Sequence, residues 1–198
     1  GMLLPLNGMH AQTVRFKAQT AIGGPLKKRL WQQIVQAKIR TQSTVLSMFY
    51  GEDWGLRQIA KRVRSGDSAN AEARAARIYW TKLFPEDGAF VRSDSEDARN
   101  HQLDYGYAVL RATVTRALCA SGLHPGFSLK HCSPYNNFPL ADDLMEPFRP
   151  FIDIAVRERC DSAAPAGLDS TGKRRLLETM TMHYSDGEES RTLFDWIQ

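Results

Sequence analysis

The sequence predicts an all-α protein built as a helical bundle. Apolar residues recur with helical spacing in several long segments, while strand-like alternation of polar and apolar residues is nearly absent. Of the 198 residues, 42% are hydrophobic and 24% are charged, which is ordinary composition for a globular protein. The length fits one domain. We divide it into an irregular N-terminal arm, residues 1–24, and a helical domain, residues 25–198.

The first predicted helix runs from Pro25 to about Phe49, after the turn-like sequence AIGGP. Its expected apolar stripe comprises Leu30, Ile34, Ala37, Thr41, Val45 and Met48. A shorter helix is expected over about 54–63. The polar sequence RSGDSAN then separates it from a third helix, over about 69–84, because Ser, Asp and Asn favour helix N-caps.

The longest predicted helix spans about 98–120, and Gly106 lies inside it. Its expected apolar stripe comprises Leu103, Tyr107, Leu110, Val114 and Ala117. Glycine inside a helix costs on the order of 1 kcal/mol relative to alanine, so we expect another helix to approach closely there. An acidic segment and a helix through about Arg159 follow. Beyond a linker, 170–184 and 190–198 read as two short amphipathic pieces.

Net charge, cysteine content and the lack of long apolar runs limit the classes of partner and site that the protein can have. The formal charge of +4 fits a nucleic-acid partner without requiring one. The three cysteines are far apart and form no CxxC pair, which favours a reducing compartment, hence the cytoplasm, and argues against a cysteine zinc site. No apolar run has the length of a membrane span, and no signal peptide is visible, so we expect no membrane partner.

The acidic segment that follows His131 is open to two interpretations. As one ideal helix, residues 140–155 turn Asp142, Glu146, Arg149 and Asp153 away from the apolar stripe. That pattern favours a solvated face with a Glu146–Arg149 pair, and a histidine satisfied by the polar sequence YNN. Pro147, however, lacks an N–H and its ring clashes with an earlier carbonyl, so the helix must bend or restart there. A kinked segment that brings acids toward His131 is the alternative, and it indicates a metal site.

Glu72 is a carboxylate in line with the apolar stripe of the third predicted helix. Residues 72, 76, 79 and 83 share one helical face. A buried acid needs a cation, a metal or a proton, since an unpaired buried charge is costly. The alternative is that Glu72 lies in the first turn, where an acid complements the helix dipole. Carboxylates with few nitrogen ligands suit Mg²⁺ or Mn²⁺, although zinc also accepts such ligands.

Basic residues gather in clusters that bracket the Glu72 helix. The clusters are Lys27, Lys28 and Arg29; Lys38 and Arg40; Lys61, Arg62 and Arg64; Arg74 and Arg77. Most such residues are simply solvated, yet their placement suits a phosphate backbone that approaches a metal.

Several sequences, in one order and with compatible spacing, resemble CRISPR-associated protein 1, the adaptation integrase, in its type II form. They are LWQQIVQAKIRTQ, RSGDSANAEARAARIYW, LDYGYAVLRATVTRAL, GLHP and H…YNNFPLADDLMEPFRPFID. The resemblance runs from about Leu3 to about Arg159. It implies an all-helical catalytic domain, here without the strand-rich N-terminal domain of that family. Asp104 stands where Asn is expected in the YGY sequence, and Cys132 where a basic residue is common.

The resemblance also implies function and site residues. The family is a metal-dependent DNA endonuclease and integrase that acquires new spacers with CRISPR-associated protein 2, as a homodimer. Its ligands for Mg²⁺ or Mn²⁺ fall on Glu72, His131 and Glu146, which would be the catalytic residues, with Asp143 as a possible secondary ligand. DNA contacts are expected from Lys38, Arg62, Arg64 and Arg149. The absent domain leaves the dimer open. The alternative function is a truncated, inactive remnant that binds DNA or a protein.

Overall fold

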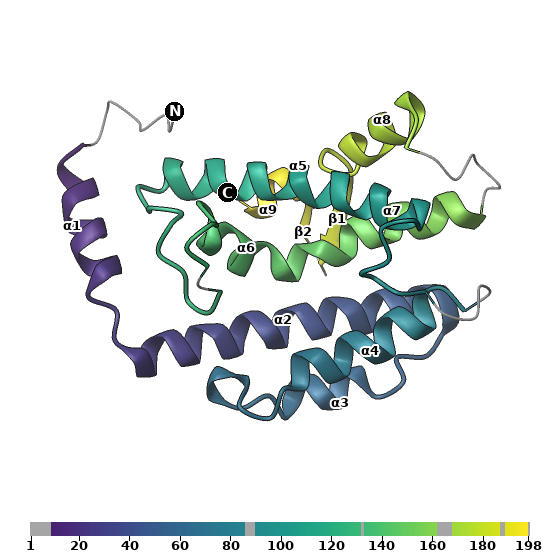
Figure 1. Ribbon diagram of the computed structural model, residues 1–198, viewed down its shortest axis with the longest axis horizontal. Helices are drawn as coiled ribbons and strands as arrows, with labels where there is room; N and C mark the ends of the chain where they lie inside the picture. The colour runs from purple at the N-terminus through teal and green to yellow at the C-terminus, as the bar shows by residue number, and fades with distance from the viewer. Residues whose placement is uncertain (1–8, 86–89, 132, 162–167, 187–188, 198) are drawn as a thin grey trace.

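The computed structural model describes residues 9–85, 90–131, 133–161, 168–186 and 189–197. Within these ranges the protein is helical apart from one two-stranded antiparallel hairpin, so the predicted all-α fold is confirmed (Figure 1). The helices are α1 (Met9–Thr20), α2 (Gly24–Tyr50), α3 (Leu56–Lys61), α4 (Ala71–Leu83), α5 (Ala98–Ala120), α6 (Pro139–Met145), α7 (Arg149–Asp161), α8 (Ser170–Glu178) and α9 (Leu193–Ile197). Two 3₁₀ turns, η1 (Ser65–Asp67) and η2 (Glu146–Phe148), and the strands β1 (His183–Asp186) and β2 (Glu189–Thr192) complete them.

The expected irregular arm at residues 1–24 is wrong for the part that the structure describes. Residues 9–20 form α1, which is held against the loop after α5 by Gln19 and Arg15. The Gln19 amide donates to the His124 carbonyl and accepts from the His124 N–H, and Arg15 donates to the Ser121 carbonyl. The sequence of α1 has a weak apolar stripe, so tertiary contacts rather than periodicity define this helix.

Helix α2 is the central element of the fold. Helices α3 and α4 pack on one side of it, and α6, η2 and α7 lie on the other (Figure 1). Ile34 and Val45 of the predicted stripe are buried, but Met48 is exposed. The core residues that the stripe missed are Trp31, Val35, Ile39 and Leu46. A helix covered on two sides buries more than one stripe, which a single-face pattern does not capture.

The close helix approach expected at Gly106 is confirmed. A Cβ atom on Gly106 would lie 2.4 Å from Cγ2 of Ile152. Helices α5 and α7 are therefore in close contact at Gly106. Each helix carries a buried polar residue next to this contact, Tyr107 on α5 and Asp153 on α7.

The C-terminal region departs from two amphipathic helical pieces. Residues 170–178 form α8, but 183–192 contain the β1–β2 hairpin before the short α9. Tyr184 of the hairpin packs against Phe151 of α7, with ring centroids 4.6 Å apart. This contact gives the hairpin a tertiary partner that its short sequence does not reveal. No helix in the described ranges is long and apolar enough to cross a lipid bilayer.

Candidate metal centre and its basic surroundings

Glu72 lies in the first turn of α4, whose N-terminus is capped from outside the helix. The Asp67 carboxylate accepts hydrogen bonds from the backbone N–H groups of Ala71 and Glu72, at 2.8 and 3.0 Å. The turn that brings Asp67 there needs left-handed backbone at Asp67 and Asn70, residue types that tolerate it. The Glu72 side chain is 22% exposed, so it is neither a solvated surface acid nor a core residue.

Glu146 lies at the break that Pro147 introduces. Helix α6 ends at Met145, η2 carries the chain over three residues, and α7 restarts at Arg149. The solvated face expected from one ideal helix is wrong, because Glu146 and Asp153 are 4% and 1% exposed. The kink and the α2 helix packed against η2 together bury what regular periodicity would turn outward. The predicted Glu146–Arg149 pair is confirmed at 3.1 Å.

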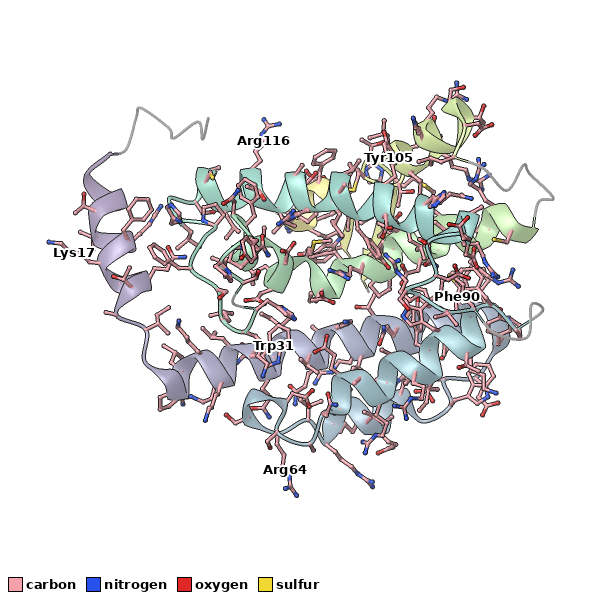
Figure 2. The ribbon with its side chains drawn as sticks, viewed as in Figure 1. Lys17, Trp31, Arg64, Phe90, Tyr105 and Arg116 are labelled. Carbon is pink, nitrogen blue, oxygen red and sulfur yellow. The ribbon has the colours of Figure 1, made fainter. Side chains whose placement is uncertain are left out.

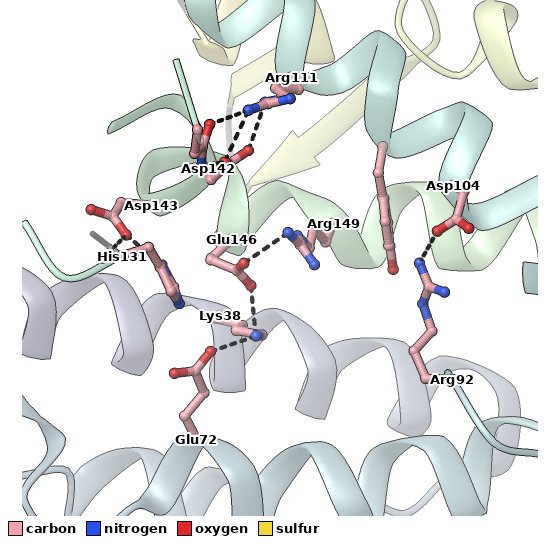
Figure 3. A network of polar contacts seen from close by, with 12 residues as sticks. Lys38, Glu72, Arg92, Asp104, Arg111, His131, Asp142, Asp143, Glu146 and Arg149 are labelled. Carbon is pink, nitrogen blue, oxygen red and sulfur yellow. Dashed lines mark hydrogen bonds and ion pairs between the residues drawn. The ribbon is translucent and has the colours of Figure 1, made fainter. Parts of the chain in front are cut away.

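Lys38 of α2 lies between the two glutamates (Figure 3). Its Nζ is 2.7 Å from Oε1 of Glu72 and 2.6 Å from Oε2 of Glu146. Burial lowers the pKa of the Lys38 ammonium, but the pairs with Glu146 and Glu72 outweigh burial, so this pKa lies above its usual value. The structure thus holds two carboxylates, 74 positions apart in the chain, against one cation.

His131 is positioned by Asp143 rather than by the polar loop that follows it. Its Nδ1 donates to Asp143 Oδ1 at 2.6 Å. The fully buried Asp143 also accepts from the backbone N–H groups of Leu129 and Lys130, at 2.7 and 3.0 Å. The hydrogen bond with Asp143 raises the pKa of His131, against the lowering effect of partial burial.

Trp31 packs against the His131 ring and helps to fix its orientation. The two rings meet edge to face, with centroids 5.2 Å apart. Figure 3 shows the imidazole extending from Asp143 toward Lys38 and Glu72. Asp143 and Trp31 therefore fix the direction of the ring and leave Nε2 as the nitrogen on the side of the glutamates.

The expected convergence of Glu72, His131 and Glu146 into a ready metal site is not found. In the described part of the chain, no three His, Cys, Asp or Glu side chains stand close enough together to hold a metal ion as placed. Glu72 and Glu146 instead share the Lys38 ammonium. The donor set still fits a divalent cation, because two carboxylates already converge on one positive charge and a histidine nitrogen faces them.

The predicted DNA contacts divide into two places. Arg62 and Arg64 are exposed beyond α3, and Figure 2 shows Arg64 pointing away from the body of the protein. Lys28 joins them, because its side chain packs over Gly66 of η1. Lys38 and Arg149, by contrast, lie inside the site, each paired with Glu146.

A second polar cluster lies beside the group formed by Lys38, Glu72 and Glu146. It consists of Asp153, Tyr79 and Tyr107, and the sequence analysis missed it. Asp153 of α7 accepts hydrogen bonds from the hydroxyls of Tyr79 and Tyr107, at 2.9 and 2.5 Å. Burial raises the pKa of Asp153 to about 6, although the two hydroxyls and the charges of Arg149 and Arg92 act in the opposite direction. The only sequence signal was that Tyr79 and Tyr107 both fall on apolar stripes, where a hydroxyl needs a partner.

Comparison with known proteins identifies the family. The model of the family described as CRISPR associated protein Cas1 matches residues 1–164. A CRISPR-associated endonuclease Cas1 of Neisseria meningitidis serogroup C (strain 8013) is 43% identical over an alignment of 188 residues, and the match covers 93% of this chain. The chain belongs to the Cas1 family. It spans 60% of the length of that relative.

Solved structures agree on the fold of this Cas1-family chain. A casposase bound to its integration product matches 98% of the chain and 67% of its own, with a TM-score of 0.77 and 22% identity. A partial Cas6-RT-Cas1–Cas2 complex contains a chain of which 66% matches 91% of this one, with a TM-score of 0.75 and 17% identity. At these identities the likeness establishes a shared fold, the helical fold predicted from the sequence.

Proposed function

We propose that this chain carries a metal-dependent DNA endonuclease and integrase site of CRISPR adaptation. The observation that carries the proposal is the convergence of Glu72 and Glu146 on the Lys38 ammonium, at 2.7 and 2.6 Å. Two carboxylates this close repel each other, and a cation between them offsets the repulsion. Membership of the Cas1 family and the endonuclease name of its relatives give that cation site a chemical purpose.

Glu72, Glu146 and His131 would hold Mg²⁺ or Mn²⁺. Asp143 would act through His131, since its hydrogen bond to Nδ1 fixes the tautomer that leaves Nε2 available. Among the described residues, its hydrogen bonds come from the N–H groups of Leu129, Lys130 and His131, which suits an orienting carboxylate better than the secondary ligand that the resemblance implies. A bound divalent cation would polarise a DNA phosphodiester and offset the charge that develops on it.

The surrounding cations fit a polyanionic substrate. Arg149 lies against Glu146 with its guanidinium over the Tyr107 ring, 4.8 Å from the centroid, so it is held in place at the edge of the site. Arg62, Arg64 and Lys28 offer exposed charge on the α3–η1 side. We propose DNA as substrate and CRISPR-associated protein 2 as partner, with a homodimer as the working assembly. The Cas1–Cas2 complex with the same fold supports the choice of partner.

The proposal is tested by DNA cleavage with Mn²⁺ or Mg²⁺, on linear and branched duplexes. Glu72→Gln, Glu146→Gln and His131→Gln should each lower the cleavage rate by on the order of 100-fold or more, because each removes a metal ligand. Asp142→Asn is the matched control. Its carboxylate lies in the same acidic segment but pairs with Arg111 at 2.8 Å, outside the site, and cleavage should persist.

Two outcomes would contradict this function. Cleavage that survives in all three site variants would come from another site. A wild-type protein that binds DNA but cleaves none of these substrates with either metal would favour the DNA-binding remnant without turnover. Salt dependence of binding belongs in the same experiment, since phosphate contacts by Lys and Arg weaken steeply as salt rises.

A further inference from the structure

Lys38 occupies the space where the two glutamates of the proposed metal centre meet. Its ammonium lies 2.7 Å from Glu72 and 2.6 Å from Glu146, and its side chain is only 12% exposed. The contact with Glu72 is a hydrogen bond, whereas the contact with Glu146 Oε2 is an ion pair. A cation that the chain itself supplies therefore offsets the charge of both carboxylates.

The charges around Glu146 do not leave room for a further cation beside Lys38. Arg149 already pairs with Oε1 of Glu146, so Lys38 and Arg149 together balance the two glutamates. A divalent ion added to this group would bring two more positive charges next to the ammonium, in a site with little water to screen them. Loss of Lys38 from the site relieves that repulsion, whereas Arg149 is held by the Tyr107 ring.

We propose that Lys38 is an internal counter-ion that the divalent metal displaces when the site is loaded. The inference rests on the proposed metal site and adds to it an autoinhibitory contact. The flexible four-carbon stem of a lysine allows its ammonium to swing away without movement of α2. Once released, the ammonium lies beside the loaded site and is available to a DNA phosphate. Lys38 would thus be the counter-ion of the two glutamates in the metal-free site and a DNA contact in the metal-bound site.

The first test is the affinity for Mn²⁺, measured by isothermal titration calorimetry without DNA. Lys38→Met should bind Mn²⁺ about tenfold more tightly or better, because the ammonium that lies between Glu72 and Glu146 is then gone. Lys38→Arg keeps the charge and should bind no more tightly than the wild type. Lys17→Met is the matched control for loss of one lysine, since Lys17 is exposed on α1 and points outward (Figure 2). Its affinity should not change.

The second test uses the wild-type protein, so it does not depend on the folding of a variant. Reductive methylation of lysines, followed by peptide mass spectrometry, should modify Lys38 slowly without metal and several times faster with saturating Mn²⁺. Lys17 should react at one rate throughout. Lys38 reactivity that does not rise with Mn²⁺, or Lys38→Met affinity equal to or below wild type, would overturn the displacement while the metal site itself stands. If neither the wild type nor Lys38→Met binds Mn²⁺, the proposed metal site fails, and the displacement fails with it.

Discussion

Two polar clusters lie side by side in this protein, one around Lys38 and one around Asp153, and the carboxylates in them have different kinds of partner. Glu146 meets two cations, Lys38 and Arg149, and shares the first with Glu72. Asp153, seven residues further along the same kinked segment, meets two tyrosine hydroxyls instead. The first arrangement holds two carboxylates against an exchangeable cation, whereas burial raises the pKa of Asp153 in the second although its hydroxyl donors act in the opposite direction.

This difference in partners suits the two clusters to different roles. Cations can be exchanged for other cations, so the Lys38 cluster suits metal binding. Hydroxyl donors from α4 and α5 fix Asp153 at the point where these helices meet α7, so the Asp153 cluster suits structural support. Glu146 and Asp153 are both buried, so burial alone does not mark a metal-binding carboxylate.

The largest expected effect is on the pH dependence of stability through Asp153. Its pKa is about 6 in the folded protein and about 3.8 when unfolded. The folded state therefore holds this proton more tightly, and the contribution of Asp153 is fully present below about pH 4 and lost as pH rises through 6. The loss amounts to about 3 kcal/mol in the free energy of unfolding. Urea unfolding of the wild type and Asp153→Asn across this range measures it.

Asp153→Asn removes that ionisation and should flatten the curve, so the difference between the two proteins must change with pH. Parallel curves would show that Asp153 titrates alike in both states. Other groups also titrate in this range, His131 among them, which is why the comparison with the variant is needed.

The next effect concerns the helix contact beneath Asp153. Gly106→Ala would place a Cβ against Ile152 Cγ2 and should lower the free energy of unfolding by about 1–3 kcal/mol through overpacking. Gly24→Ala is the control, because no atom lies within 4 Å of its added Cβ. Recovery of stability in Gly106→Ala/Ile152→Ala would confirm the cause. Equal stability of the two single variants would mean that α5 and α7 are not in close contact.

A smaller loss is expected when one donor to Asp153 is removed. Tyr107→Phe should cost about 1–2 kcal/mol of stability, because it leaves a buried acceptor with one partner fewer. Tyr135→Phe makes the same change on a residue that is 93% exposed and should be neutral. Thermal unfolding of Tyr107→Phe and Tyr135→Phe measures the two effects. An equally small change of the unfolding temperature in both variants would contradict a structural role for Asp153.

The smallest effect is expected at Asp104, where the resemblance anticipated Asn. Asp104 pairs with Arg92 at 2.5 Å but is 65% exposed. Asp104→Asn should therefore change stability by less than about 1 kcal/mol. A larger loss in thermal unfolding would show that this exposed carboxylate contributes as much to stability as the buried Asp153.

The sequence predicted the helices well where one face of each is buried. The bounds of α5 and the close approach at Gly106 followed from periodicity and glycine chemistry alone. Helix α1 and the β1–β2 hairpin did not, because their stability depends on tertiary partners such as His124 and Phe151.

The sequence proposed the residues of the candidate site but not their arrangement. Glu72, His131 and Glu146 follow from the resemblance and from the proline break, and their role as ligands stays a prediction. The place of Lys38 was not, since no local pattern pairs one lysine with acids 34 and 108 residues away. The same reason hid Asp153, whose helical position pointed to solvent.

The position of a bound ion is the most direct test of whether Glu72, Glu146 and His131 form one metal site. Crystals of the protein soaked in Mn²⁺ would give that position by anomalous diffraction. We expect an anomalous peak between the carboxylates of Glu72 and Glu146, on the side of the His131 ring, with the Lys38 ammonium moved away from both. A peak elsewhere, with both Lys38 ion pairs intact, would contradict it.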